Sequence, residues 1–181
     1  MPSAITIRRV LPEEWKLWRD VRLRMLRDDA DFFSSRYEDA VRDPDERWRA
    51  WVAATADESS QRALFCADPG DGPWLGVVGA FVRVDPSEAQ LISMWVSPDA
   101  RGSGIAKRLI AAVGDWAGAQ GCRDVVLFVQ EANQPAHRVY RQLGFEATGD
   151  RAPIGGGRTG FKLVLRAPAA HLSSFTTKET P

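Results

Sequence analysis

The chain is 181 residues long, a length that suits one domain able to bury a core without disulfides or a metal. Its 24 Lys and Arg residues balance 24 Asp and Glu residues, and this zero net charge argues against a nucleic-acid-binding protein, which is usually basic. No apolar run approaches the roughly 20 residues of a membrane span, and the segment from Met1 to Val10 lacks the apolar stretch of a signal peptide. We therefore expect a cytoplasmic protein with neither nucleic acid nor a membrane as partner.

The first half of the chain predicts a strand, two helices and three further strands. Residues 5–10 alternate in polarity, which is typical of a strand. A helix follows at Pro12, because proline is tolerated in a first turn and the glutamates beside it suit the positive end of a helix dipole. The other elements predicted here are a helix opened by residues 43–46 and strands at 62–67, 74–84 and 88–96. The last two strands are joined by a short turn and predict a hairpin.

The second half predicts helices and strands in alternation. A helix with apolar residues at helical spacing runs from Ile105 to a stop at Gly121. Residues 124–129 are rich in β-branched and apolar side chains, which favours a central, buried strand. A short helix at 134–143 and strands at 145–148 and 160–165 complete the series.

This order of elements predicts an α/β or α+β chain with a mixed sheet. We expect one domain over residues 1–166. Residues 167–181 are expected to form a loose, polar C-terminal tail.

Cysteine and histidine offer no metal or redox site in this sequence. Cys66 and Cys122 lie far apart, fit no metal-binding or redox spacing, and each sits beside apolar residues. His137 and His171 are too few and too scattered to ligate an ion. We therefore expect two reduced, mostly buried thiols and no metal.

A turn that contains two glycines joins the strand at 88–96 to the next helix. Gly102 and Gly104 lack a β-carbon, so an anion can approach the backbone closely. The first N–H groups of a helix have no internal partners, and Arg101, Lys107 and Arg108 add positive charge around them. These features are those of a phosphate cradle, although a tight structural turn would use the same glycines. The glycine spacing fits neither a Walker loop nor a dinucleotide fingerprint.

Two motifs here resemble those of the GCN5-related N-acetyltransferase (GNAT) family. The family's acetyl-CoA motif, Gln/Arg-x-x-Gly-x-Gly/Ala, is matched by Arg101, Gly104 and Ala106. It follows a strand with an apolar pair spaced by one residue, matched by Met94 and Val96, and a proline turn. A second segment, Asn-x-x-Ala-x-x-x-Tyr-x-x-x-Gly-Phe, is matched by Asn133, Ala136, Tyr140, Gly144 and Phe145. The detailed resemblance covers roughly residues 75–150.

The resemblance implies the GNAT fold, a mixed, mostly antiparallel sheet of about seven strands flanked by about four helices. The implied order is β-α-α-β-β-β-α-β-α-β-β. It implies an enzyme that moves the acetyl group of acetyl-CoA to a primary amine by direct attack within a ternary complex. The expected acceptor is a small molecule. The alternatives are a lysine or N-terminal amine of a protein, or an acyl-CoA-binding sensor without catalysis. Dimers are common in the family, so a homodimer is a further expectation.

The resemblance also implies which residues bind acetyl-CoA. Backbone N–H groups of the glycine turn would hold the pyrophosphate, and the strand before it would pair with the pantetheine arm. The Val96 N–H would face the thioester oxygen and stabilise its developing negative charge. Asn133 would hydrogen-bond the arm, although it is equally suited to cap the helix that begins at Gln134. The full expected set is Met94, Trp95, Val96, Arg101, Gly102, Ser103, Gly104, Ile105, Ala106, Lys107, Asn133 and Tyr140.

Tyr140 and Glu88 are the candidates for catalysis. The phenol of Tyr140 could protonate the thiolate that an attacking amine expels, or it could be a tyrosine of the core. An alkyl amine with a pKa near 10 is only about one part in a thousand neutral at pH 7, so a base is needed. Some family members use a Glu six residues ahead of the position of Val96, where this chain has Gln90. Glu88 has the same strand parity, and we expect either Glu88 or a chain of waters to act.

The acceptor side is the least informative part of the sequence. Residues 28–46 combine acids with the aromatic side chains of Phe32, Phe33 and Tyr37. An acidic loop with aromatic walls could attract a cationic amine, and a solvated loop anchored by its aromatics would show the same pattern. The acids are Asp28, Asp29, Asp31, Glu38, Asp39, Asp43, Asp45 and Glu46.

Overall fold

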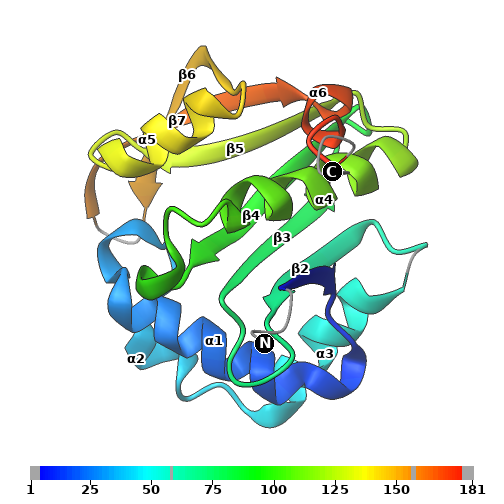
Figure 1. Ribbon diagram of the computed structural model, residues 1–181. Helices are drawn as coiled ribbons and strands as arrows, with labels where there is room; N and C mark the ends of the chain where they lie inside the picture. The colour runs from blue at the N-terminus through cyan, green and yellow to red at the C-terminus, as the bar shows by residue number, and fades with distance from the viewer. Residues whose placement is uncertain (1–4, 58, 156–157, 177–181) are drawn as a thin grey trace.

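A seven-stranded sheet runs through the molecule, with helices on both of its faces (Figure 1). The computed structural model describes residues 5–57, 59–155 and 158–176. In spatial order the strands are β1 (Thr6–Arg9), β2 (Arg62–Asp68), β3 (Gly76–Val82), β4 (Glu88–Val96), β5 (Asp124–Gln130), β7 (Arg158–Pro168) and β6 (Glu146–Gly155). Neighbouring strands are antiparallel except β4 and β5, which are parallel. The mixed, mostly antiparallel sheet expected from the sequence is confirmed.

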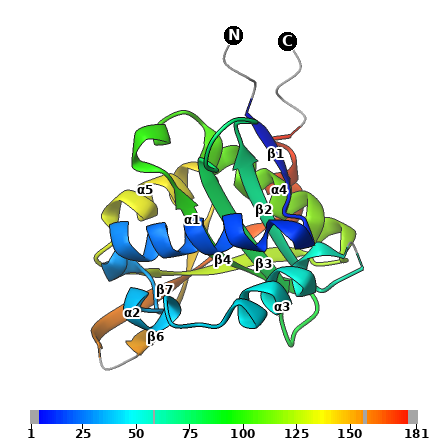
Figure 2. The ribbon, with the colours of Figure 1, turned by 90° about the horizontal axis from the view of Figure 1, so that it is seen from below.

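The helices divide between the two faces of the sheet. Helices α1 (Trp15–Asp28) and α3 (Asp45–Ala56) cover one face, and α4 (Ile105–Ala119) and α5 (Gln134–Gln142) lie on the other (Figures 1 and 2). Two short helices, α2 (Tyr37–Ala40) and α6 (Ala169–Ser173), were not expected. None of the helices in the described ranges is long and apolar enough to cross a membrane.

Tryptophan dominates the core between the sheet and α1. Helix α1 buries Trp18, Val21 and Met25 on one stripe at helical spacing. These side chains belong to one cluster with Trp48 of α3 and Trp95 of β4. Burying one large apolar side chain contributes about 1.5–3 kcal/mol, so this cluster fixes α1 firmly against β4.

Helix α4 packs on the opposite face through an apolar stripe of its own. Leu109, Ile110 and Val113 are fully buried and share a cluster with Val78 of β3 and Val125 of β5. Because only residues 97–104 separate β4 from α4, this packing holds the first turn of the helix near the end of that strand.

The end of the chain differs from the prediction. Strand β7 continues to Pro168, and α6 follows it directly. Leu172 of α6 is fully buried, and a β-carbon built on Gly114 of α4 would lie only 2.7 Å from that of Leu172. The prediction of a loose tail is therefore wrong for residues 167–176, because a few apolar residues suffice to dock this short helix. Residues 177–181 of that predicted tail lie outside the described residues.

Candidate active site

Strands β4 and β5 pair over only a short length and then separate. Residues 88–90 of β4 pair in parallel with residues 124–126 of β5, and the register ends there. Residues 91–96 and 127–130, the C-terminal parts of the two strands, therefore face each other without pairing. Figure 1 shows the two strands diverging from the end of the sheet near α6.

A β-bulge explains why β4 leaves its neighbour. Val77 of β3 opposes Trp95, whereas Gly79 opposes Ile92, so β4 carries one extra residue between them. Ser93 lies in this bulge with a φ of 53°, and no other non-glycine residue among those described has a positive φ. A bulge bends its strand and increases the local twist, which turns β4 away from β5.

The separated strands form the walls of a cleft of about 1300 Å³. The first turns of α4 and α5 line the cleft on one side of the sheet. Arg22 of α1 and residues 32–35 line it on the other. The cleft therefore passes between the strands and is lined by residues from both faces of the sheet.

The backbone of Val96 faces this cleft. The N–H of Ser97 donates to the carbonyl of Leu75, the residue just before β3, so it points toward β3. Backbone groups alternate in direction along a strand, so the N–H and carbonyl of Val96 point away from β3. The carbonyl accepts a hydrogen bond from Nε of Arg101 at 3.1 Å, which agrees with this direction. The Val96 N–H thus points toward the cleft.

The glycine turn has the backbone geometry of an anion cradle. Gly102 and Gly104 have φ values of 81° and 84°, a region that other residues seldom adopt, and a β-carbon on either would meet open space. Gly104 directly precedes α4, so the first N–H groups of the helix are presented at the turn. The hydroxyl of Ser103 donates to the carbonyl of Ala100 at 2.6 Å and holds the turn closed.

Two of the three expected cations lie at this turn. Arg101 and Lys107 line the cleft, and the ammonium of Lys107 sits 5.2 Å from the ring centroid of Phe175. Arg108 does not join them, because its guanidinium donates to the carbonyl of Ile5 at 2.8 Å. The expected contribution of Arg108 to the cradle is therefore wrong.

Asn133 and Tyr140 meet the cleft from α5. The side-chain oxygen of Asn133 accepts from the N–H of Ala136 at 3.1 Å, which confirms the expected helix cap, while the residue also lines the cleft. Tyr140 lies seven residues further along, about two helical turns, with its ring edge-on to Phe145 at 5.6 Å between centroids. Burial raises the pKa of the Tyr140 phenol above its ordinary value, so this group stays protonated.

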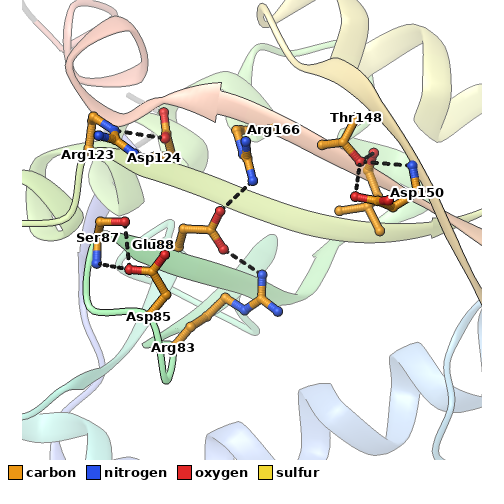
Figure 3. A network of polar contacts seen from close by, with 10 residues as sticks. Arg83, Asp85, Ser87, Glu88, Arg123, Asp124, Thr148, Asp150 and Arg166 are labelled. Carbon is orange, nitrogen blue, oxygen red and sulfur yellow. Dashed lines mark hydrogen bonds and ion pairs between the residues drawn. The ribbon is translucent and has the colours of Figure 1, made fainter.

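Glu88 is not brought to the cleft. Its carboxylate lies 2.6 Å from Nη1 of Arg83 and 2.5 Å from Nη2 of Arg166, as Figure 3 shows. It occupies the first position of β4, eight residues before Val96, which is a distance of about 26 Å along an extended strand. Gln90 has the same parity and does line the cleft. The position of Glu88 therefore contradicts the expectation that it serves as the base.

The acids of residues 28–46 do not form a negative surface in the cleft. Asp28 pairs with Arg24 and Arg27, and Asp43 and Asp45 pair with other arginines on the helices. Asp29 lines the cleft but bonds to Trp95 and Arg101. The structure instead brings Arg22 into the cleft, a residue that was not predicted to belong to the site. The sequence does mark Arg22 as unusual, because this charged residue lies between Trp18 and Met25 on the otherwise apolar stripe of α1.

The chain is similar in sequence to known acetyltransferases. A family model described as "Acetyltransferase (GNAT) family" matches residues 22–145. N-acetyltransferase 8 of Rattus norvegicus is 33% identical over 117 residues, which are 57% of this chain and 53% of that protein. Aminoglycoside N(6')-acetyltransferase type 1 of Stenotrophomonas maltophilia is 31% identical over 153 residues, 81% of this chain and 89% of that protein. The chain thus spans about half the length of the first relative and most of the second.

The fold itself has a solved counterpart in Salmonella typhimurium, described with its cofactor acetyl-CoA. That structure superposes with a TM-score of 0.74 at 17% identity, over 92% of this chain and 95% of the other. Within the ranges described here, no group of three or more His, Cys, Asp or Glu side chains is placed to hold a metal ion.

Proposed function

Because this chain belongs to the acetyltransferase (GNAT) family, we propose that it is an acetyl-CoA-dependent N-acetyltransferase acting on the primary amine of a small molecule. The family resemblance found in the sequence is confirmed. The observation that carries the proposal is the open cleft between β4 and β5, which ends at the glycine turn before α4. A cleft lined from both faces of the sheet offers room for the acetyl donor and the amine to meet between the strands.

The residues of the cleft fit coenzyme A. The two left-handed glycines and the free N–H groups of α4 suit a pyrophosphate, and Lys107 adds a positive charge beside them. The unpaired edge of β4 suits the amide-containing pantetheine arm, which can bond to it as an added strand would. Asn133 at the start of α5 offers a side-chain amide to the same arm.

Two groups of this chain serve the acyl transfer. The Val96 N–H binds the thioester oxygen and stabilises the negative charge that develops there when the amine attacks. Tyr140 donates its phenolic proton to the sulfur as the carbon–sulfur bond breaks. The raised pKa of Tyr140 supports this role, since a donor must carry its proton before the step. The amine loses its proton to water in the cleft, because Glu88 is held elsewhere.

Direct attack within a ternary complex is the route that this cleft favours. An acyl-enzyme formed on cysteine would need a thiol in the cleft, and neither Cys66 nor Cys122 lines it. Burial raises the pKa of Cys66 to about 12, so its thiolate is scarce at neutral pH. The homodimer expected for the family stays a prediction.

Release of free coenzyme A thiol, measured against a panel of small amines, tests the proposal. We expect turnover with at least one amine, and tight binding of acetyl-CoA by titration calorimetry. Tight binding without turnover of any small amine would favour a protein acceptor or a sensor. Absence of acetyl-CoA binding would contradict the proposal as a whole.

A further inference from the structure

The cleft has two halves that differ in the face of the sheet they belong to. Met94 and Val96 of β4 pack toward α4, whereas Trp95 packs toward α1. On β5, Leu127 and Val129 pack toward α4, so Phe128 and Gln130 point to the α1 face by alternation. The half on the α1 face, here called the acceptor half, is lined by Arg22, Phe33, Gln90, Ile92, Phe128 and Lys162.

Arg22 brings a positive charge into the acceptor half with only neutral partners. Its guanidinium donates to the hydroxyls of Ser35 at 3.1 Å and Ser93 at 3.4 Å, and lies 5.4 Å from the ring centroid of Phe33. No carboxylate among the described residues pairs with it. Burial lowers the pKa of Arg22 to about 10, so the group remains charged at neutral pH while it has lost much of its hydration.

Lys162 adds a second positive charge to the acceptor half. It lies opposite Gln130 across the β5–β7 ladder, so both side chains share a face of the sheet. The side-chain amide of Gln130 donates to the carbonyl of Asp31, just after α1, which identifies that face as the α1 side. The ammonium of Lys162 sits 5.8 Å from the ring centroid of Phe128.

The charge balance of the cleft decides what kind of amine it can hold. Asp29 is the one carboxylate among the described residues that line it, and Arg101 neutralises this charge at 2.7 Å. A polycationic acceptor would thus meet two cations and no free carboxylate. The relative that acts on aminoglycosides is therefore a poor guide to the acceptor of this chain.

We propose that the acceptor is an amine that also carries a carboxylate, and that Arg22 binds this carboxylate. This inference rests on the acetyltransferase function proposed above. The guanidinium offers parallel N–H donors that match the two oxygens of a carboxylate. Ser93 places this contact at the bulge of β4, where the strand turns from β5 and the amine has to reach the thioester. Phe33 lies beside it, and Ile92 and Phe128 add apolar surface to the same half of the cleft, which suits an amino acid with an apolar side chain.

Matched acceptors test this proposal in the same thiol-release assay. The pairs are L-phenylalanine with L-phenylalaninamide and L-leucine with L-leucinamide, and spermidine, kanamycin and O-phosphoethanolamine complete the set. Each amide keeps the primary amine and the side chain and removes the anionic charge. Because the amine of an amide is less basic, a larger fraction of it is neutral, so preference for the acid would run against this chemical bias.

We expect kcat/KM at least about 30-fold higher for the acid than for its amide, and we expect Arg22→Gln to remove most of this preference. Arg22→Lys keeps the charge without the planar pair of donors and should fall between the two. Arg27→Gln is the matched control, because it makes the same change on an exposed turn of the same helix, outside the cleft.

The outcomes separate this inference from the function on which it rests. Equal use of acid and amide, preference for a polycation or phosphate, or a preference that survives Arg22→Gln would overturn the role of Arg22 while leaving the acetyltransferase intact. If no amine turns over, calorimetry on the wild-type complex with coenzyme A decides instead. Binding of N-acetyl-L-phenylalanine but not of its amide would support the proposal, and equal or absent binding would overturn it.

Discussion

The carboxylate of Asp29 lies 2.7 Å from Nη2 of Arg101, a residue 72 positions further along the chain. The same carboxylate oxygen accepts a hydrogen bond from Nε1 of Trp95 at 2.9 Å. Asp29 caps the C-terminal end of α1, so this oxygen joins the helix of the acceptor half to the first residue of the glycine turn. The two halves of the cleft are therefore connected through one side chain.

A double-mutant cycle measures how much this connection contributes to stability. Asp29→Asn and Arg101→Gln, made singly and together, should show a coupling in the free energy of unfolding of about 0.5–1.5 kcal/mol, since the pair is partly exposed. Urea denaturation is the measurement. The local pair of Asp43 and Arg47, only one helical turn apart, is the control and should couple by about 0.3–0.5 kcal/mol. Equal coupling in both pairs would mean that the contact between Asp29 and Arg101 adds no more to stability than a local surface ion pair.

Tyr140→Phe tests the assigned proton donor. The ring keeps its packing on Phe145 while the hydroxyl is lost, so kcat should fall by at least about tenfold with no change in the Kd of acetyl-CoA. Single-turnover kinetics and calorimetry give the two quantities. A fall in affinity without a fall in kcat would assign the hydroxyl to binding.

The pH dependence of kcat follows from the same residue. Tyr140 must be protonated to act, and burial raises its pKa, so any loss of activity from its ionisation begins at a higher pH than for an ordinary phenol. We expect no decline of kcat attributable to this group below about pH 10. An alkaline limb well below that pH, absent from Tyr140→Phe, would show that the phenol ionises more easily than its burial implies.

Glu88→Gln separates structural support from catalysis. Its two arginine partners are partly exposed, so we expect a loss of about 1–2 kcal/mol in the free energy of unfolding, and an unchanged kcat in the folded enzyme. Denaturation and steady-state assays on one preparation measure both. A large fall in kcat without loss of stability would restore Glu88 as a base acting at a distance.

Two glycines of α4 offer a matched test of how α6 is docked. A β-carbon on Gly114 would lie 2.7 Å from the β-carbon of Leu172 and from the N–H nitrogen of Ser173, whereas one on Gly118 would meet nothing within 4 Å. Gly114→Ala should therefore destabilise the protein by about 1–3 kcal/mol. Gly118→Ala should stabilise it by about 0.5–1 kcal/mol, because alanine favours the helix. Thermal unfolding of the two variants compares them, and similar midpoints would argue against the docking of α6.

The sequence predicted the fold well where periodic patterns were long. Strand β4 and the start of α4 agree with the prediction to the residue, because a Pro-Asp turn and two glycines separate an apolar strand from an amphipathic helix. The end of the chain was harder, since α6 has only five residues and its docking depends on Leu172 meeting Gly114. A helix this short has no periodicity to detect.

The site was predictable only where it depends on backbone motifs. The glycine turn and the cap at Asn133 follow from local residue types. The bulge at Ser93 does not, because its left-handed residue is not a glycine and nothing nearby marks an extra residue. The prediction that Glu88 lies at the site rested on strand parity alone, and the structure places it with Arg83 and Arg166 instead. Parity gives the face of a strand, but it does not give the distance along it.

The brief pairing of β4 with β5 divides the sheet into a set of β1 to β4 and a set of β5, β7 and β6. Between these sets the ladder is short. Residues 91–96 and 127–130 pair with β3 and β7 on their outer sides, but their amides that point into the cleft have no partner strand. These amides should exchange their hydrogens with solvent early, and the two sets should open as separate cooperative units. A molecule lying between β4 and β5 supplies the missing partner, so coenzyme A binding should slow exchange across the whole seam and merge the two units into one.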